Sequence, residues 1–165
     1  MVGPLSFNIR YYTPTDEDAA IALWLRTWKV AYPDVDFDAR VAWWRERWCN
    51  ELLPKSKAVV AERDDTLIGF VTIEPATGYL DQIVVAPEAW GTGIAEDLLT
   101  EAKRLSPGRI DLLVNTDNHR AVRFYRKHGF EITGADVSLI SRRPVHKMSW
   151  RGDQAPSNCS LASRA

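Results

Sequence analysis

The feature that most constrains this chain is an apolar run that leads into a turn with two glycines. The run covers residues 80–87, the turn covers residues 90–93 (Trp-Gly-Thr-Gly), and an amphipathic segment follows from Ile94. A strand, a glycine turn and a helix N-terminus together hold a phosphate, because the first N–H groups of a helix are unpaired and its dipole is positive there. Glycine also lets a ligand approach the backbone without a Cβ in the way. The pattern therefore predicts a site for a phosphate-bearing cofactor.

The spacing within the turn argues against two common nucleotide motifs. A dinucleotide-binding turn carries a third glycine three residues after the second, where this chain has Glu96, whose carboxylate would repel a pyrophosphate. A phosphate-loop ATPase needs a Gly-Lys-Ser or Gly-Lys-Thr ending, which the chain lacks. The cofactor is therefore expected to be of another kind.

A second segment points to a family. After another apolar run, residues 110–114, residues 118–130 contain the pattern Asn-x-x-Ala-x-x-Phe-Tyr-x-x-x-Gly-Phe. Together with the Val-x-Pro and Gly-Thr-Gly-Ile-Ala sequences before it, this resembles the GNAT superfamily of N-acetyltransferases, most closely over about residues 78–131. The resemblance implies a mixed α/β fold, with a central, mostly antiparallel sheet splayed at the cofactor site and flanked by helices. It also implies acetyl-CoA as the cosubstrate.

The resemblance implies that acetyl-CoA is held mainly by the backbone. Ile83 and Val85 would pair with the pantetheine arm, and amides of the turn would wrap the pyrophosphate. Where the family usually has Gln or Arg before the first glycine, this chain has Trp90. The change removes a polar contact to the cofactor and predicts a lower affinity for it. The alternative is that Trp90 is a surface aromatic residue that covers the turn. Arg120 and Lys127 would compensate if they reach phosphates, although solvated helix charges are commoner. The residues that the resemblance assigns to the cofactor are Ile83, Val84, Val85, Trp90, Gly91, Thr92, Gly93, Ile94, Ala95, Glu96, Asn118, Ala121, Phe124 and Tyr125.

The resemblance also implies direct attack of the amine on the thioester in a ternary complex, without a covalent enzyme intermediate. A backbone N–H near Val84 or Val85 would polarise the thioester carbonyl. Tyr125 occupies the general-acid position and would protonate the departing thiolate, a task that suits a phenol with a reference pKa of about 10. Packing beside Phe124 is the structural alternative for this tyrosine.

The general base is left open between two carboxylates. Asp81 lies on the central strand and Glu74 ends the preceding one, and either would accept the ammonium proton through a water. Ordinary solvated or turn-bonding carboxylates are the commoner explanation for both.

The acceptor site is expected between residues 24 and 48, where aromatic residues and aspartates are concentrated. Aromatic faces near carboxylates suit a cationic or aromatic amine. Helical phase assigns four tryptophans to the core, Trp24, Trp28, Trp44 and Trp48. Tyr32 and Trp43 are then the best pocket candidates, with Trp28 beside them. A small-molecule amine is the first choice of acceptor, and a protein N-terminus or lysine, or a non-catalytic acetyl-CoA sensor, are the alternatives.

Length and composition suit one domain over residues 1–150, followed by an aperiodic tail, residues 151–165, expected to be mobile. A net charge of −1 argues against a nucleic-acid partner. No apolar run approaches the ~18 residues of a membrane span and no signal pattern is present, so a cytoplasmic protein is expected. Cys49 and Cys159 have no metal-ligand spacing, and no metal is expected. A homodimer is an ordinary expectation for such a domain.

Periodicity and turn signals predict the order of the elements. They are a strand over 7–12, a helix over 15–30, a helix from Asp36 or Asp38, a hairpin of 58–62 and 67–73, a strand ending at 85, a helix over 93–105, a strand over 110–114, a helix over 118–128 and a closing hairpin of 131–141 and 145–150.

Overall fold

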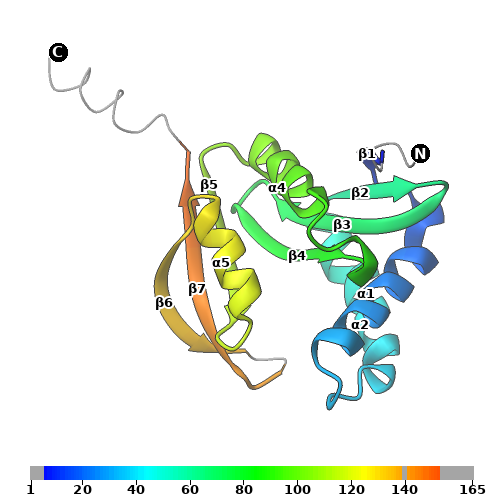
Figure 1. The fold of residues 1–165 in the computed structure, drawn as a ribbon, viewed down its shortest axis with the longest axis horizontal. Coiled ribbons are helices and arrows are strands. Elements are labelled where there is room, and N and C mark those ends of the chain that lie inside the picture. The colour runs from blue at the N-terminus through cyan, green and yellow to red at the C-terminus, as the bar shows by residue number, and fades with distance from the viewer. Residues whose placement is uncertain (1–5, 139–140, 153–165) are drawn as a thin grey trace, which may run out of the picture.

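The strands of this chain form one open sheet in the computed structural model, which describes residues 6–138 and 141–152 (Figure 1). Within that range the sheet has seven strands in the order β1-β2-β3-β4-β5-β7-β6. They are β1 (Asn8–Tyr11), β2 (Lys57–Arg63), β3 (Thr66–Glu74), β4 (Tyr79–Val85), β5 (Arg109–Asn115), β6 (Glu131–Val137) and β7 (Pro144–Arg151). The helices are α1 (Glu17–Ala31), α2 (Val41–Arg47), α3 (Leu53–Lys55), α4 (Ile94–Leu105) and α5 (His119–Lys127).

The sheet opens between β4 and β5, which are its parallel neighbours. Their register contains only the pair Tyr79–Asp111, at the N-terminal ends of both strands, and the Asp111 N–H also donates to the Gly78 carbonyl at 2.9 Å. The other neighbouring pairs are antiparallel and are paired over several residues. Figure 1 shows the result as two limbs, with β5, β6, β7 and α5 on one side and β1–β4 with α1, α2 and α4 on the other. The expected splayed, mostly antiparallel sheet is confirmed.

Different helices cover the two faces of the central strands. A Cβ at Gly69 on β3 would lie 3.1 Å from Leu98 Cδ1 of α4. The next residue, Phe70, points to the opposite face, where its ring centroid lies 5.2 Å from that of Trp48. Residues 67–73 are consequently all buried, which explains why β3 is a continuous apolar run and not an alternating one.

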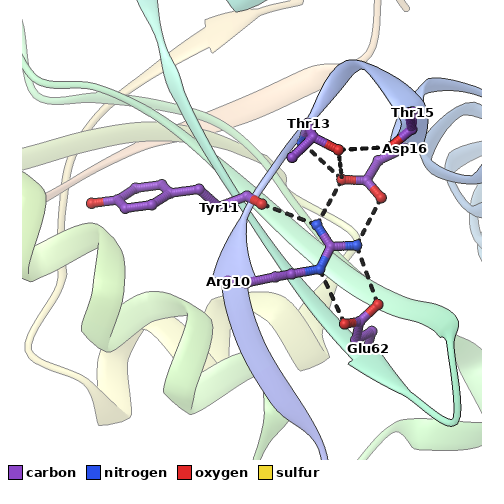
Figure 2. A network of polar contacts seen from close by, with 6 residues as sticks. All are labelled: Arg10, Tyr11, Thr13, Thr15, Asp16 and Glu62. Carbon is purple, nitrogen blue, oxygen red and sulfur yellow. Dashed lines mark hydrogen bonds and ion pairs between the residues drawn. The ribbon is translucent and has the colours of Figure 1, made fainter.

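A polar cluster ties the N-terminal strand to the first helix. Figure 2 shows Arg10 of β1 between two carboxylates, Asp16 just before α1 and Glu62 on β2. The guanidinium donates to the two Asp16 oxygens at 2.8 Å each and to Glu62 at 3.1 Å. Asp16 also accepts the Thr13 N–H at 2.8 Å, as expected of an acid at a helix start. Hydrogen bonding to Arg10 holds the pKa of Asp16 below its usual range.

Most element boundaries agree with the periodicity, and two differ. The helix expected from Asp36 or Asp38 is broken into a 3₁₀ turn at Asp38–Arg40, α2, a π-helical segment at Trp48–Leu52 and α3. The expected boundary between the domain and the tail, at residue 151, also differs from the structure. Arg151 belongs to β7, and the Gly152 N–H donates to the Gly108 carbonyl at 3.1 Å. The rest of that tail, with Cys159, and residues 139–140 of the closing hairpin lie outside the described residues.

Candidate active site

A cavity of about 840 Å³ occupies the opening between β4 and β5 and continues between α1, α2 and α5. Most residues expected at the site line it: Trp28, Tyr32, Trp43, Asp81, Ile83, Val84, Val85, Trp90, Ala95, Asn118, Ala121, Phe124 and Tyr125. Gly91, Thr92, Gly93, Ile94, Glu96 and Glu74 are not among its lining residues. The first four of these lie between Trp90 and Ala95, and Glu96 directly follows Ala95, so all five are close in sequence to residues that line the cavity, and Glu74 is the exception.

The glycine turn has the conformation that an anion cradle requires. Gly91 and Gly93 have φ values of +78° and +91°, a region that side-chain-bearing residues rarely adopt. A Cβ placed on Gly91 would meet nothing within 4 Å, so the space above it is open. The Asp97 N–H donates to the Gly93 carbonyl and closes the first turn of α4, which leaves the N–H groups before it without a helical carbonyl. Open space and unpaired N–H groups fit the pyrophosphate of a CoA thioester.

The register of β4 determines which backbone groups face the opening. Because the Ala86 N–H donates to the Ile68 carbonyl and ladder bonds alternate along an antiparallel pair, the N–H and carbonyl of Val84 point towards β3. The Val84 carbonyl accordingly lies 3.0 Å from a Cβ placed on Gly69. The N–H and carbonyl groups of Ile83 and Val85 point the other way, into the opening. An extended ligand can therefore pair with these two residues as a strand would.

Trp90 is built into the end of β4. Its indole N–H donates to the Val85 carbonyl at 2.8 Å, and the carbon at the centre of the Arg120 guanidinium lies 4.0 Å from the centroid of its ring. The ring thus covers the C-terminal end of β4 while it keeps 37% exposure. One carbonyl that faces the opening is already occupied by this side chain.

Tyr125 lies on α5 with its side chain almost fully enclosed. It is 6% exposed, and its ring centroid lies 5.4 Å from those of Phe124 and Phe130. Burial raises the pKa of Tyr125 well above its ordinary value, so the phenol is protonated at neutral pH. At the start of the same helix the Asn118 Oδ1 accepts the Ala121 N–H at 3.2 Å, which is the cap expected from the sequence.

Both carboxylates that were candidates for the general base, Asp81 and Glu74, contact other side chains. Asp81 forms a two-point ion pair with Arg47, with N–O distances of 3.1 and 2.6 Å, and it also accepts a hydrogen bond from Gln82 Nε2 at 3.0 Å. Both oxygens of Asp81 are therefore engaged by the Arg47 guanidinium, and one of them also accepts from Gln82. Glu74 is the last residue of β3, accepts a hydrogen bond from the Thr77 hydroxyl and lies 4.0 Å from the ammonium of Lys55. It is placed away from the cavity.

Tyr32 joins the end of α1 to the opposite limb. Its hydroxyl accepts a hydrogen bond from Asn115 Nδ2 at 2.8 Å and donates to Asp117 at 3.1 Å. The guanidinium of Arg143 lies over the Tyr32 ring at 4.8 Å and pairs with Asp117 at 3.5 Å. Burial is the first cause that raises the pKa of Tyr32. All four residues line the cavity, and Tyr32 is the one among them that was expected there from the sequence.

The tryptophans divide between the core and the cavity wall. Trp24, Trp44 and Trp48 are at most 5% exposed, and Trp24 stacks on Trp44 with centroids 4.7 Å apart. Their assignment to the core is confirmed. Trp28 is half-buried and stacks on Tyr32 at 5.7 Å, and Trp43 is 42% exposed, so both lie at the surface of the cavity.

Metal sites and membrane spans are two further features of interest. Within residues 6–138 and 141–152, no cluster of three or more His, Cys, Asp or Glu side chains has the arrangement of a metal site. None of the helices described there is both long enough and apolar enough to span a membrane.

Comparison with known proteins gives consistent matches. The model of the acetyltransferase (GNAT) family matches residues 18–130. The peptidyl-lysine N-acetyltransferase YjaB of Salmonella typhimurium is 31% identical over 132 residues, which are 79% of this chain and 87% of that protein. A mycothiol acetyltransferase of Kineococcus radiotolerans is 31% identical over 144 residues, 81% of this chain and 45% of that protein. The PaiA N-acetyltransferase of Thermoplasma acidophilum, solved with coenzyme A, superposes with a TM-score of 0.73 at 22% identity, covering 88% of this chain and 99% of that one, and shares its fold.

Proposed function

The chain belongs to the acetyltransferase (GNAT) family, and from that premise we propose that it transfers the acetyl group of acetyl-CoA to a primary amine of a small molecule. It is an enzyme of the acyl-CoA-dependent N-acyltransferase class. The observation that carries the proposal is the opening between β4 and β5, which has a glycine turn at one side and Tyr125 at the other. The acetyl-CoA thioester supplies the activated acyl group, and every other function falls to residues of this chain.

The backbone of β4 and the turn after it would hold the cosubstrate. The carbonyl of Ile83 and the N–H of Val85 face the opening and would pair with the amide groups of the pantetheine arm. The Val85 carbonyl already accepts the Trp90 indole N–H. The N–H groups of the turn and of the first turn of α4 would bind the pyrophosphate.

Two donors would act on the reacting thioester. The Ile83 N–H, which the alternation of β4 directs into the opening, would donate to the carbonyl oxygen as negative charge develops there, and it would lower the barrier by about 3 kcal/mol. The amine nitrogen forms a bond to the acyl carbon and the carbon–sulfur bond breaks. Tyr125 then gives its phenolic proton to the sulfur. The solvent takes the proton that the amine releases, and Tyr125 recovers a proton from the solvent. Asp81 would orient Arg47 and would not act as a base, since both of its oxygens are engaged.

The acceptor would enter from the side of α1 and α2. Trp28, Tyr32 and Trp43 present aromatic faces there, which suit a cationic amine. Asp34 also lines the cavity and is exposed, and it has no ion pair within the described part of the chain, so it would attract such a cation. The bridge from Tyr32 to Asp117 and Arg143 narrows the cavity and supports a compact acceptor.

A library of small primary amines, incubated with acetyl-CoA and followed by the release of free thiol, tests this proposal. We expect at least one amine to give thiol release that depends on both the enzyme and the amine. If the protein binds acetyl-CoA in a calorimeter but no amine or lysine peptide releases thiol, the chain would be a non-catalytic sensor instead.

A lysine side chain of a protein is the second candidate acceptor. The similarity to the enzyme of Salmonella typhimurium, which covers 87% of that protein and whose name specifies peptidyl-lysine, favours it. A set of lysine-containing peptides in the same assay distinguishes the two. If a peptide is used with a kcat/KM at least tenfold above that of every small amine, the peptide acceptor replaces the small molecule.

A further inference from the structure

Arg120 contacts an aromatic ring at the cavity, whereas Arg47 and Arg143 form ion pairs there. Arg47 pairs with Asp81, and Arg143 pairs with Asp117. Arg120, the second residue of α5, also lines the cavity, but within residues 6–138 and 141–152 no carboxylate forms an ion pair with it. Arg120 instead lies over the Trp90 indole, with its guanidinium carbon 4.0 Å from the ring centroid. It is therefore a cation at the site without a counter-ion from the described chain.

The stack holds this cation in a defined place. A guanidinium within about 6 Å of an indole centroid is attracted by the ring electrons. The indole in turn is fixed by its hydrogen bond to the Val85 carbonyl at 2.8 Å. The guanidinium carries five N–H groups in its own plane, and no ion pair with the described residues uses them. The edges of the guanidinium remain available because Arg120 is exposed overall.

The position of the stack is next to the predicted phosphate cradle. Trp90 directly precedes Gly91 in the turn, and Arg120 follows the Asn118 cap of α5. The contact therefore joins the limb that carries β4 to the limb that carries α5. A planar guanidinium suits phosphate oxygens, because two parallel N–H groups can bind two oxygens at once. Partial desolvation lowers the pKa of Arg120, yet an arginine remains charged at neutral pH.

We propose that Arg120 binds a phosphate group of CoA and that Trp90 is the positioning residue that holds it at the turn. This inference depends on the proposed function, because it assumes that CoA occupies the opening. Trp90 then has a role of its own: it replaces the polar residue usual at this position with a ring that positions a cation from α5. Two kinds of phosphate on CoA share this chemistry, the pyrophosphate and the ribose 3′-phosphate.

Calorimetric titration of CoA into matched variants tests the contact. Arg120→Gln is expected to weaken CoA binding about tenfold, the effect of losing one charged hydrogen bond. Arg123→Gln is the control, because Arg123 is an exposed residue of the same helix that does not line the cavity, and its Kd is expected to stay within about twofold of the original. Arg120→Lys keeps the charge without the flat stack and is expected to fall between them. Thermal unfolding without CoA checks that each variant is folded.

The role of Trp90 is tested by combining substitutions. If Trp90 acts by positioning Arg120, Trp90→Ala weakens binding in the original protein and has little further effect when Arg120→Gln is already present. Independent, additive losses would overturn the positioning role. Titration with 3′-dephospho-CoA distinguishes the two phosphates, since the loss in Arg120→Gln disappears with this ligand if the 3′-phosphate is bound and persists if the pyrophosphate is bound.

Two negative results have different meanings. If Arg120→Gln and Arg123→Gln bind CoA equally well, the Arg120 contact is wrong while the proposed function stands. If the unaltered protein binds no CoA, both the proposed function and this contact are overturned.

Discussion

Tyr125 is the single residue whose environment most directly suggests a chemical role. Its burial between Phe124 and Phe130 raises its pKa, so the phenol keeps its proton over the neutral range. A proton donor must hold its proton until the leaving group needs it, and a departing thiolate is a suitable acceptor. The same burial would make the hydroxyl a poor base, which assigns Tyr125 to the acid side of the reaction.

Tyr125→Phe is therefore expected to lower kcat about a hundredfold or more while the Kd for acetyl-CoA changes less than about twofold. Tyr11→Phe is the control, since Tyr11 is 52% exposed on β1 and contacts Arg104. Stopped-time thiol release gives kcat, and calorimetry gives the Kd. Because the pKa of Tyr125 is raised, kcat of the original enzyme should not fall between pH 7 and pH 9. Unchanged kcat in the phenylalanine variant would remove Tyr125 from the mechanism.

The ion pair of Asp81 and Arg47 is expected to contribute to the stability of the fold. Both side chains are at most 15% exposed, and removing one partner leaves a largely buried charge without its counter-ion. Asp81→Asn should lower the free energy of unfolding by about 2–4 kcal/mol. Asp38→Asn, which removes the exposed pair with Lys29, should cost less than about 1 kcal/mol. Urea denaturation measures both.

The kinetics of Asp81→Asn test whether Asp81 is the base. We expect the acidic limb of its kcat profile to keep the same midpoint as in the original enzyme, because another group or the solvent takes the proton. Loss of that limb in the asparagine variant would restore Asp81 as the base.

Among the elements, the start of α1 depends on a contact that crosses three segments. Arg10 of β1 binds Asp16 before the helix and Glu62 of β2 (Figure 2). The folded-state pKa of Asp16 is lowered, so its contribution to stability is complete above the unfolded value of about 3.9 and is lost as the pH falls towards the folded value. The N-terminal strand is thus held to the helix by a pH-dependent contact.

Asp16→Asn should accordingly lower the free energy of unfolding by about 1–3 kcal/mol at pH 6. The difference from the original protein should shrink as the pH is lowered from about 3.9 towards the lower pKa of folded Asp16, below which the carboxylate of the original protein is also neutral. Denaturation by urea at a series of pH values checks this. A difference that is constant from pH 6 to pH 2.5 would show that the charge of Asp16 is not the cause.

Most elements could be predicted from the sequence because their signals are local. Ile94, Leu98 and Ala102 recur at helical spacing and are buried on α4, and the Asn118 cap and the positive φ of Gly129 bound α5 as expected. The second helix was harder to predict. Trp48, the first residue of the π-helical segment, packs on Phe70 of β3, and local periodicity along the chain does not predict such a contact or the change of helix type.

At the scale of the whole molecule, the site depends on contacts between segments that are far apart in the sequence. Tyr32 reaches Asp117 over 85 positions of sequence, and Arg47 reaches Asp81 over 34. Such pairs are created by the strand order and by the opening between β4 and β5, and no spacing rule along the chain predicts them. The backbone cradle, by contrast, lies within one continuous segment and was predicted. The sequence consequently indicated the cofactor better than the base or the acceptor site.

Backbone amide NMR during titration with CoA shows directly whether the cosubstrate lies in the opening between β4 and β5. We expect the largest amide shift changes at Val85 and over residues 91–96. The Val84 amide, which points to β3, should change little. Shift changes confined to amides outside the opening, or none at Val85 and 91–96 at saturating CoA, would contradict this placement of the cosubstrate.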